Sequence, residues 1–214
     1  MRTPELVTEY ERGTDNSKEI FTQLEQAGYR YLGGGQDATV WGRDEGEVLK
    51  VLMPAVNKAA AEASFIQFFD MCTSLKRNPH VPKFFGGHEA FSINGVDYIQ
   101  ITMESLTEIQ SSSTQEAIVW ALSDLCTDLS VNWKTVIAQI SDPEFWRLYP
   151  GKRNDPAFIN QVVSDARHYK KLFATMQFFY QHGTKLGLGW DLHTENAMQR
   201  NDGTIVITDP YFTS

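Results

Sequence analysis

The hydrophobic pattern of this chain changes its period once, near residue 104, and that change limits the folds that the chain can adopt. Before it, short aliphatic and aromatic segments alternate with glycine-containing turns, which is typical of antiparallel strands. After it, apolar residues recur every three or four positions, which is typical of helices packed on one face. We therefore predict an α+β chain in two lobes, with a β-rich first lobe at residues 1–104 and a mainly helical second lobe at residues 105–214.

The expected elements follow this division. In the first lobe the patterns predict two helices, at residues 17–27 and 56–72. Five short strands are expected around them, at residues 29–32, 39–42, 47–52, 89–93 and 96–103. The last two strands flank Asn94 and Gly95, a pair that tolerates positive φ and is preferred in tight hairpin turns. The second lobe is expected to contain two long helices and a final hairpin, at residues 115–129, 155–182 and 197–208.

Composition and charge exclude several classes of protein. Hydrophobic residues make up 42% of the chain and charged residues 21%, which is ordinary globular usage and argues against a disordered or fibrous protein. The net charge of -8 argues against a general nucleic-acid binder, whose affinity comes from neutralising phosphates with Lys and Arg. No apolar run approaches membrane-spanning length, and the N-terminus lacks the apolar core of a signal peptide. We expect a soluble, cytoplasmic monomer, with Cys72 and Cys126 as buried thiols.

A glycine-rich turn joins the first two expected strands. Gly33, Gly34 and Gly35 lie in it, and Val40 follows in the second strand. Glycine lets the backbone approach a ligand closely and point N–H groups at phosphate, although an ordinary hairpin explains the turn equally well. Because the turn joins two strands and does not open a helix, it fits neither a dinucleotide fingerprint nor a Walker loop.

Lys50 interrupts an otherwise apolar strand. Period-two alternation places it on the same face as Val48 and Leu52, and the opposite face is apolar as well. We expect a substantially buried lysine, which needs an anionic partner. Glu62, an acid among small residues of the following helix, is the natural partner. The alternatives left open are a lysine whose ammonium reaches water at a sheet edge and a glutamate on a solvated helix face.

The most specific arrangement of polar residues lies near the C-terminus. Asp191 is followed by His193 and Asn196, and Asp209 comes thirteen residues after Asn196. Asn196 and Asp209 offer hard oxygen ligands that could hold Mg²⁺ against nucleotide phosphates. Asp191 stands apart from them and could orient and deprotonate a hydroxyl nucleophile.

Taken in chain order, these motifs resemble the protein-kinase-like superfamily over residues 29–209. Gly33, Gly35 and Val40 match its glycine loop, with Ala38 at the position of the third glycine. The resemblance implies a two-lobed protein-kinase-like fold with a five-stranded sheet and a regulatory helix in the N-lobe. It also implies a minimal C-lobe that carries a catalytic loop and a metal-binding hairpin, and it implies ATP and Mg²⁺ as ligands.

The resemblance also implies a role for each matching residue. The catalytic residues would be Lys50, Asp191 and His193. The nucleotide-binding residues would be Gly33, Gly34, Gly35, Val40, Lys50, Glu62, Met103, Glu104 and Leu106. The metal ligands would be Asn196 and Asp209.

Four of these roles can be stated in more detail. Glu62 would form the ion pair with Lys50, Met103 would be the gatekeeper, and the backbone of residues 104–106 would hydrogen-bond adenine. His193 stands in place of the usual catalytic-loop lysine. A role near the γ-phosphate and a role in bracing the loop by hydrogen bonds are both open for it.

The departures from the family pattern concern regulation. Gly189 and Trp190 replace the usual His-Arg, so the residue that holds a phosphorylated activation loop is missing. Of the Asp-Phe-Gly motif only Asp209 is retained, and five residues follow it. We expect no activation segment and no control by loop phosphorylation.

Within the superfamily, the Asp-x-His-x-x-Asn form and the Ile-Thr-Asp-Pro ending are similar to early serine/threonine kinases of lytic coliphages. Minimal kinases that bacterial pathogens inject into host cells are similar in size. The leading expectation is an ATP-dependent protein kinase that phosphorylates Ser or Thr of a host protein, as a phage or bacterial effector acting in a cytosol. Two alternatives stay open, a small-molecule phosphotransferase of the aminoglycoside or choline type and a pseudokinase that only binds.

Overall fold

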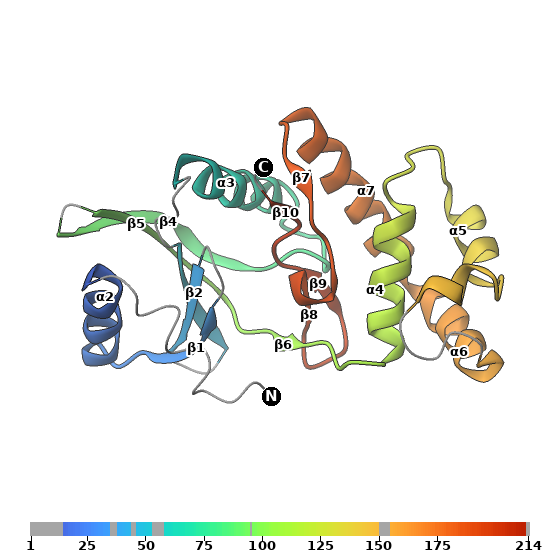
Figure 1. Cartoon of the computed structure of the whole chain (residues 1–214), viewed down its shortest axis with the longest axis horizontal. Helices are drawn as coiled ribbons and strands as arrows, with labels where there is room; N and C mark the ends of the chain where they lie inside the picture. The colour runs from blue at the N-terminus through green and yellow to red at the C-terminus, as the bar shows by residue number, and fades with distance from the viewer. Residues whose placement is uncertain are drawn as a thin grey trace. The chain divides into compact units, whose positions relative to one another are not determined.

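The structure is a computed structural model that describes residues 15–34, 38–43, 46–52, 58–94, 96–149 and 155–212. It divides into two compact units. The first comprises residues 1–69 and 83–105, and the second comprises residues 70–82 and 106–214. The first unit contains the main sheet and the second most of the helices, which confirms the predicted α+β class (Figure 1).

The first unit is built on a five-stranded antiparallel sheet in the order β1-β2-β3-β5-β4. Its strands are β1 (Arg30–Gly34), β2 (Ala38–Gly42), β3 (Glu47–Leu52), β4 (Phe84–Ile93) and β5 (Val96–Glu104). Each strand lies where the alternation predicted one, but β4 begins five residues earlier than expected. Gly86 and Gly87 interrupt its apolar pattern, and its pairing with β5 slips between Phe84 and His88.

The helix α2 (Asp15–Gln26) closes one hydrophobic core of this unit. Ile20 and Phe21 are buried, and the Phe21 ring lies edge-on to Trp41 of β2 with 4.7 Å between ring centroids. The chain leaves α2 at Gly28, whose φ of 86° suits glycine. The second expected helix is α3 (Lys58–Ser74), which crosses the boundary between the two units at residue 70.

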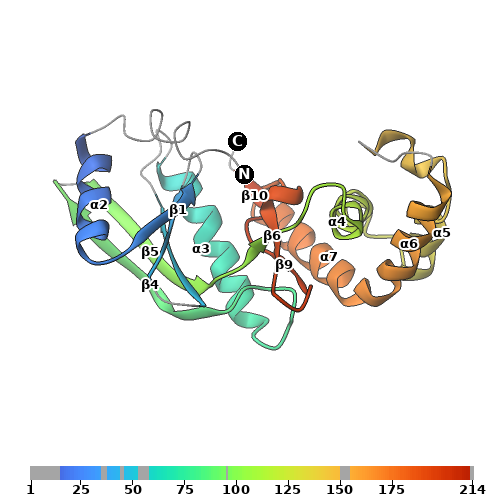
Figure 2. The same cartoon turned by 90° about the horizontal axis from the view of Figure 1, so that it is seen from below.

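Helix α4 is the central helix of the second unit. The helices are α4 (Thr114–Leu125), α5 (Trp133–Ile140), α6 (Pro156–Ala166) and α7 (Lys170–Lys185). Helix α4 contacts the other three (Figure 2). Its apolar residues are almost fully buried. Among the described residues, no helix combines the length and apolar character that crossing a membrane requires. The two thiols, Cys72 and Cys126, are buried as predicted, and burial raises the pKa of each.

One predicted helix is wrong in detail, and one helix of the structure was not predicted. The expected single helix at residues 155–182 is two helices, because a 3-10 turn, η2 (Arg167–Tyr169), separates α6 from α7. Helix α5 was not expected, since only eight residues carry its pattern. Its start is fixed by Asn132, whose side chain accepts hydrogen bonds from the N–H groups of Lys134 and Thr135.

Short strands complete the second unit. A three-stranded sheet joins β6 (Thr107–Glu108), β8 (Ala197–Gln199) and β9 (Ile205–Ile207), and a two-stranded sheet joins β7 (Gly189–Trp190) and β10 (Tyr211–Phe212). The predicted hairpin at residues 197–208 is therefore present as β8 and β9, with a third strand added at its edge.

Residues 70–82 precede β4 in the sequence but belong to the second unit. The buried His80 joins this segment to β9: its Nδ1 lies 2.8 Å from the carbonyl oxygen of Ile205, and its own carbonyl accepts from the N–H of Ile207 at 3.1 Å. Arg200 adds hydrogen bonds to the carbonyls of Pro79 and Val81. The contact with Ile205 requires a proton on Nδ1, because a carbonyl oxygen can only accept.

We expect His80 to make the second unit sensitive to acid. Burial lowers the pKa of His80, the hydrogen bond to Ile205 opposes this, and the charges of Lys171 and Arg200 lower it further. The fold therefore favours neutral His80, while the unfolded chain binds a proton below its ordinary pKa of about 6.5. The free energy of unfolding should fall as the pH drops below that value, by at most about 1.4 kcal/mol per pH unit.

Urea denaturation at pH 7.5 and pH 5.5 measures this effect. The loss of stability at the lower pH should be smaller in His80→Asn, which cannot titrate, than in the natural chain. The exposed His168 provides the matched control, His168→Asn, which should keep the full loss. An equal loss in His80→Asn and the natural chain would show that His80 does not titrate on unfolding.

Candidate functional site

The loop between β7 and β8 carries the predicted catalytic motif and is tied to the segment around Asp209. The N–H of Asp191 donates to the carbonyl of Pro210 at 2.8 Å, and the N–H of Thr208 donates to the carbonyl of Asn196 at 3.0 Å. Asp209 lies between the two bonded residues of its segment. These hydrogen bonds bring Asp191, Asn196 and Asp209 together within one unit, although 18 residues separate the first from the last.

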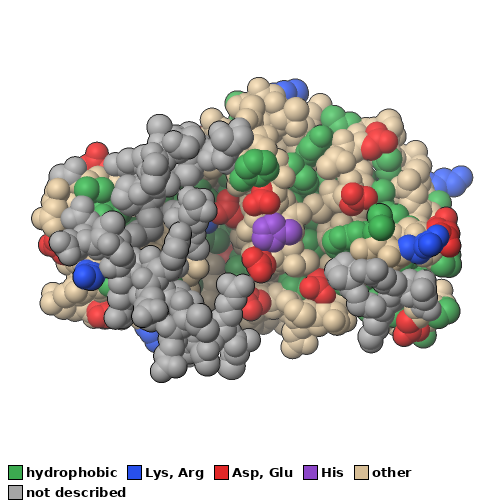
Figure 3. Space-filling model, viewed as in Figure 1, with side chains coloured by type: hydrophobic (Ala, Val, Ile, Leu, Met, Phe, Trp, Pro, Cys, Tyr) green, Lys and Arg blue, Asp and Glu red, His purple; other side chains and the backbone are tan. Residues whose placement is uncertain are grey.

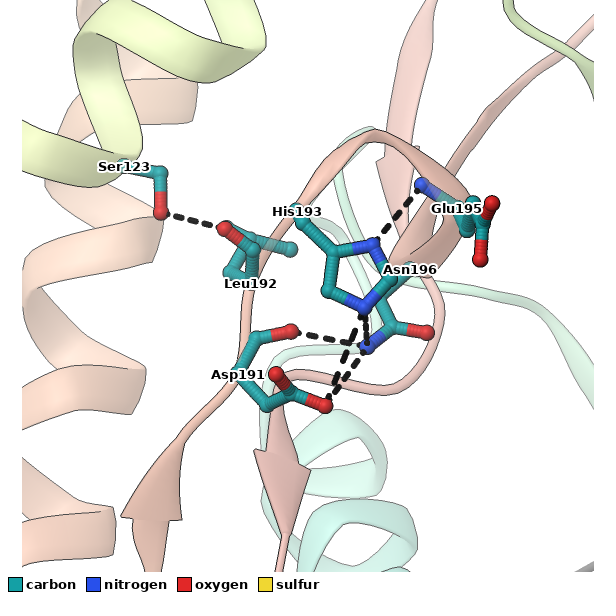
Figure 4. A network of polar contacts seen from close by, with 6 residues as sticks. All are labelled: Ser123, Asp191, Leu192, His193, Glu195 and Asn196. Atoms are coloured by element: carbon teal, nitrogen blue, oxygen red, sulfur yellow. Dashed lines mark hydrogen bonds and ion pairs between the residues drawn. The ribbon is translucent and has the colours of Figure 1, made fainter. Parts of the chain in front are cut away.

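The side chain of Asn196 points into this loop (Figure 4). Its Nδ2 donates to the backbone oxygen of Asp191 at 2.7 Å and to the Oδ2 of Asp191 at 3.3 Å. Nδ2 also lies 3.1 Å from Nε2 of His193, so its two protons face three neighbouring atoms, two of which belong to Asp191. The amide group of Asn196 therefore helps to orient the Asp191 carboxylate. Within the described part of the chain, Asn196 Oδ1 and Asp191 Oδ1 make no hydrogen bond, which leaves one oxygen of each residue to face a ligand.

His193 braces the same loop from its exposed side. Its ring lies within hydrogen-bond distance of two donors, with Nδ1 3.2 Å from the N of Glu195 and Nε2 3.1 Å from Nδ2 of Asn196. A neutral ring can accept at only one of these nitrogens. Nε2 lies 3.8 Å from Oδ2 of Asp191, and the two side chains are about half exposed, at 48% and 44%. An exposed histidine among acidic side chains can be seen on the face drawn in Figure 3. These contacts support a role of His193 in bracing the loop, and its role near a γ-phosphate stays a prediction.

The donor set fits a magnesium ion bound together with phosphates. Asn196 and Asp209 supply one amide oxygen and one carboxylate, both hard ligands that Mg²⁺ accepts. In the described residues there is no group of three or more His, Cys, Asp or Glu side chains that could hold a metal alone. Since Mg²⁺ keeps several water molecules and shares phosphate oxygens, two protein ligands are compatible with such a site.

Tyr211 and Phe212 hold the end of this segment. They form β10, in which Tyr211 pairs with Trp190 and Phe212 with Gly189. Tyr211 is buried, and its hydroxyl donates to the carbonyl of Phe179 in α7 at 2.7 Å. Burial raises the pKa of Tyr211, so this hydroxyl keeps its proton. Tyr211, which stands two positions after Asp209 where the Asp-Phe-Gly motif usually ends, is therefore part of the core.

The glycine turn is described only in part. Gly33 and Gly34 are the last residues of β1, where they pair with Val40 and Thr39, and the register slips between Tyr31 and Gly33. Open space surrounds the position of a Cβ on Gly33. Gly35, the third predicted phosphate-contacting glycine, lies outside the described residues.

Lys50 is half-buried in β3, and the residues next to it on both faces of the strand are buried. Its Nζ lies 3.9 Å from the centre of the Phe65 ring of α3, a distance at which the ammonium and the ring face attract. The sequence contained no signal for this contact. The side chain of Glu62, the predicted partner of Lys50, lies outside the described residues.

The hydrogen bonds at the end of β5 limit which backbone N–H group could donate to adenine. Met103 is buried between β3 and β4, where it pairs with Val48 and Phe84. The N–H of Glu104 donates to the carbonyl of Lys83 at 2.9 Å, and the carboxylate of Glu104 accepts from the N–H of Lys83 at 2.8 Å.

The N–H of Ser105 is also engaged, donating to the carbonyl of Gly46 at 2.8 Å. The N–H of Leu106 forms no hydrogen bond within the described part of the chain. A backbone donor for adenine would therefore have to be Leu106.

No protein-family model matches the chain, and no curated protein does. Three solved structures show a distant likeness. A MAP kinase from Leishmania major is 11% identical with a TM-score of 0.40, and the match covers 90% of this chain and 49% of that one. An aminoglycoside phosphotransferase from Alicyclobacillus acidocaldarius is 13% identical with a TM-score of 0.36, covering 84% and 61%. The streptomycin–ATP–APH(2″)-IIa ternary complex is 12% identical with a TM-score of 0.33, covering 89% and 69%. This chain thus spans about half to two thirds of the length of these structures.

Proposed function

We propose that the chain is an ATP- and Mg²⁺-dependent phosphotransferase that transfers the γ-phosphate to a Ser or Thr hydroxyl of a protein. The observation that carries the proposal is the set of backbone hydrogen bonds that brings Asp191, Asn196 and Asp209 together. A base with one oriented carboxylate oxygen and two hard metal ligands is the set that phosphoryl transfer to a hydroxyl needs.

Each residue has a defined part in this reaction. Asp191 accepts the proton of the attacking hydroxyl on the oxygen that Asn196 does not bind. The hydroxyl oxygen forms a bond to the γ-phosphorus while the bond to the leaving ADP oxygen breaks. Asn196 and Asp209 would hold Mg²⁺, which would supply charge neutralisation on the phosphates. Lys50 contributes a positive charge to the phosphates, as the motif resemblance implies.

The finer parts of the proposal rest on the motif resemblance. They are that the acceptor is a host protein, that the chain acts as a phage or bacterial effector in a cytosol, and that it works as a monomer. A small-molecule phosphotransferase and a pseudokinase share the same loop, and the experiment below separates them.

The test is incubation with γ-labelled ATP and Mg²⁺ in bacterial and eukaryotic lysates, with Asp209→Ala as the inactive variant. The exposed Asp70 of α3 supplies a charge-matched control, Asp70→Ala, which should label as the natural chain does. Label on discrete protein bands that disappears only in Asp209→Ala supports a protein kinase, and the responding lysate indicates the target cell.

Two other outcomes overturn the proposal. Label confined to small molecules would establish a phosphotransferase of the aminoglycoside or choline type. Binding of nucleotide that does not respond to Mg²⁺, with no label that depends on Asp209, would establish a pseudokinase.

A further inference from the structure

We infer that Ser123 of α4 is a positioning residue for the catalytic loop, which it holds through the peptide between Leu192 and His193. This inference rests on the proposed function for its effect on rate. Its structural part concerns the loop itself and can be measured without any activity.

Ser123 forms the direct side-chain contact between α4 and the loop (Figure 4). Its hydroxyl donates to the carbonyl oxygen of Leu192 at 2.6 Å and accepts from Nε1 of Trp190 at 3.3 Å. Ser123 is 8% exposed and Leu192 is 6% exposed, so water does not compete freely for these bonds. A serine inside a helix commonly bonds the carbonyl four residues earlier, and this one bonds the loop instead.

The bonded peptide joins Leu192 to His193, one residue beyond the peptide that follows Asp191. At its other end, the N–H of His193 donates to the backbone oxygen of Asp191 at 3.1 Å. The peptide of Leu192 and His193 is thus held at its carbonyl by α4 and at its N–H by Asp191. The N–H of Asp191 is in turn held by Pro210. The peptide before Asp191 is held by Pro210, the carbonyl of Asp191 accepts from Asn196 and His193, and the peptide after Leu192 is held by Ser123, so the backbone torsions of Asp191 and Leu192 have little freedom.

Removal of the hydroxyl should therefore act on rate more than on binding. A loop that is misplaced by about 1 Å loses up to about 100-fold in rate, because the base no longer meets the hydroxyl in line. We expect Ser123→Ala to lower kcat roughly 10- to 100-fold, with a KM for ATP close to that of the natural chain. Ser123→Thr restores the hydroxyl and should recover most of kcat. Trp190→Phe keeps an aromatic ring, although a smaller one, and removes the Nε1 donor, and its effect should be smaller.

Thr175 of α7 provides the matched control. It is a buried hydroxyl that donates to the carbonyl of Lys171 and accepts from Asn78, both at 2.7 Å, and neither partner belongs to the loop. Thr175→Val therefore removes an equivalent pair of hydrogen bonds elsewhere in the same unit. It should leave kcat unchanged, since its effect is on stability alone.

Amide hydrogen exchange gives the readout that does not depend on activity. In Ser123→Ala, exchange should rise at the amides of His193 and Asn196, which are bonded within the loop, and not in Thr175→Val. Unchanged exchange there, or a kcat that falls equally in both variants, overturns the inference. Raised exchange in a chain that transfers no phosphate would support the positioning role and overturn the proposed function instead.

Discussion

Asp191→Asn is expected to lower kcat about 100- to 10,000-fold, which is the contribution typical of a positioned general base. The substitution keeps the size of the side chain and removes its ability to take a proton. Asn196 donates to Oδ2 of Asp191, so the new amide should turn its own oxygen toward Asn196. Its NH₂ group would then face the attacking hydroxyl, where an acceptor is required.

Steady-state kinetics and thermal unfolding together test this prediction. The KM for ATP and the midpoint of unfolding should stay close to those of the natural chain, because the substitution changes neither the metal ligands nor the fold. Asp70→Asn, at an exposed position of α3, is the control for the loss of one charge. A kcat within about threefold of the natural value would show that Asp191 is not the base, since a general base contributes at least about 100-fold.

Gly183→Ala is expected to destabilise the second unit by about 1–2 kcal/mol, although alanine is the better helix former by about 1 kcal/mol. Gly183 is buried in α7, and a Cβ on it would lie 2.4 Å from the Tyr211 ring. Tyr211 is buried and its hydroxyl is bonded to Phe179, so the ring cannot move aside without losing that contact. Overpacking at such a site outweighs the gain in helix propensity.

Gly189→Ala is the informative comparison. Its Cβ would also come within 2.4 Å of a ring, that of Phe212, but Phe212 is 47% exposed and can turn toward solvent. We expect a change within about 0.5 kcal/mol, as for most surface substitutions. Chemical denaturation of both variants measures the difference. Equal losses in the two, or a stabilised Gly183→Ala, would contradict the account of Tyr211 as a fixed part of the core.

The sequence predicted the elements that carry a long pattern and missed those that do not. All five strands of the main sheet were predicted, because each alternates over several residues or borders a glycine turn. The two-residue strands β6, β7 and β10 have no period to detect, and tertiary contacts define them. The break between α6 and α7 contains no glycine or proline, so the helical pattern runs through it unmarked.

The same reasoning applies to the candidate site. The order of the motifs predicted that Asp191, Asn196 and Asp209 belong to one site. In the structure, backbone hydrogen bonds join the loop that carries Asp191 and Asn196 to the segment that carries Asp209. It did not predict Ser123, which lies 67 residues before Trp190 and reads as one polar position in an apolar helix. It also did not predict that Phe65 faces Lys50, since that contact depends on how α3 lies against β3.

The pairing of β7 with β10 has a consequence for the time at which the chain becomes active during its synthesis. A ribosome makes the sheet of the first unit and all four helices of the second before it reaches residues 211–212. Until those two residues have emerged, Trp190 and Gly189 lack their strand partners, and the segment around Asp209 is held only by the bonds of Thr208 and Pro210. The strand pair beside the proposed site is therefore completed after the main sheet and these helices have been made. Under the proposed function, chains truncated before residue 211 would lack this strand pair and should be less active than chains that include it.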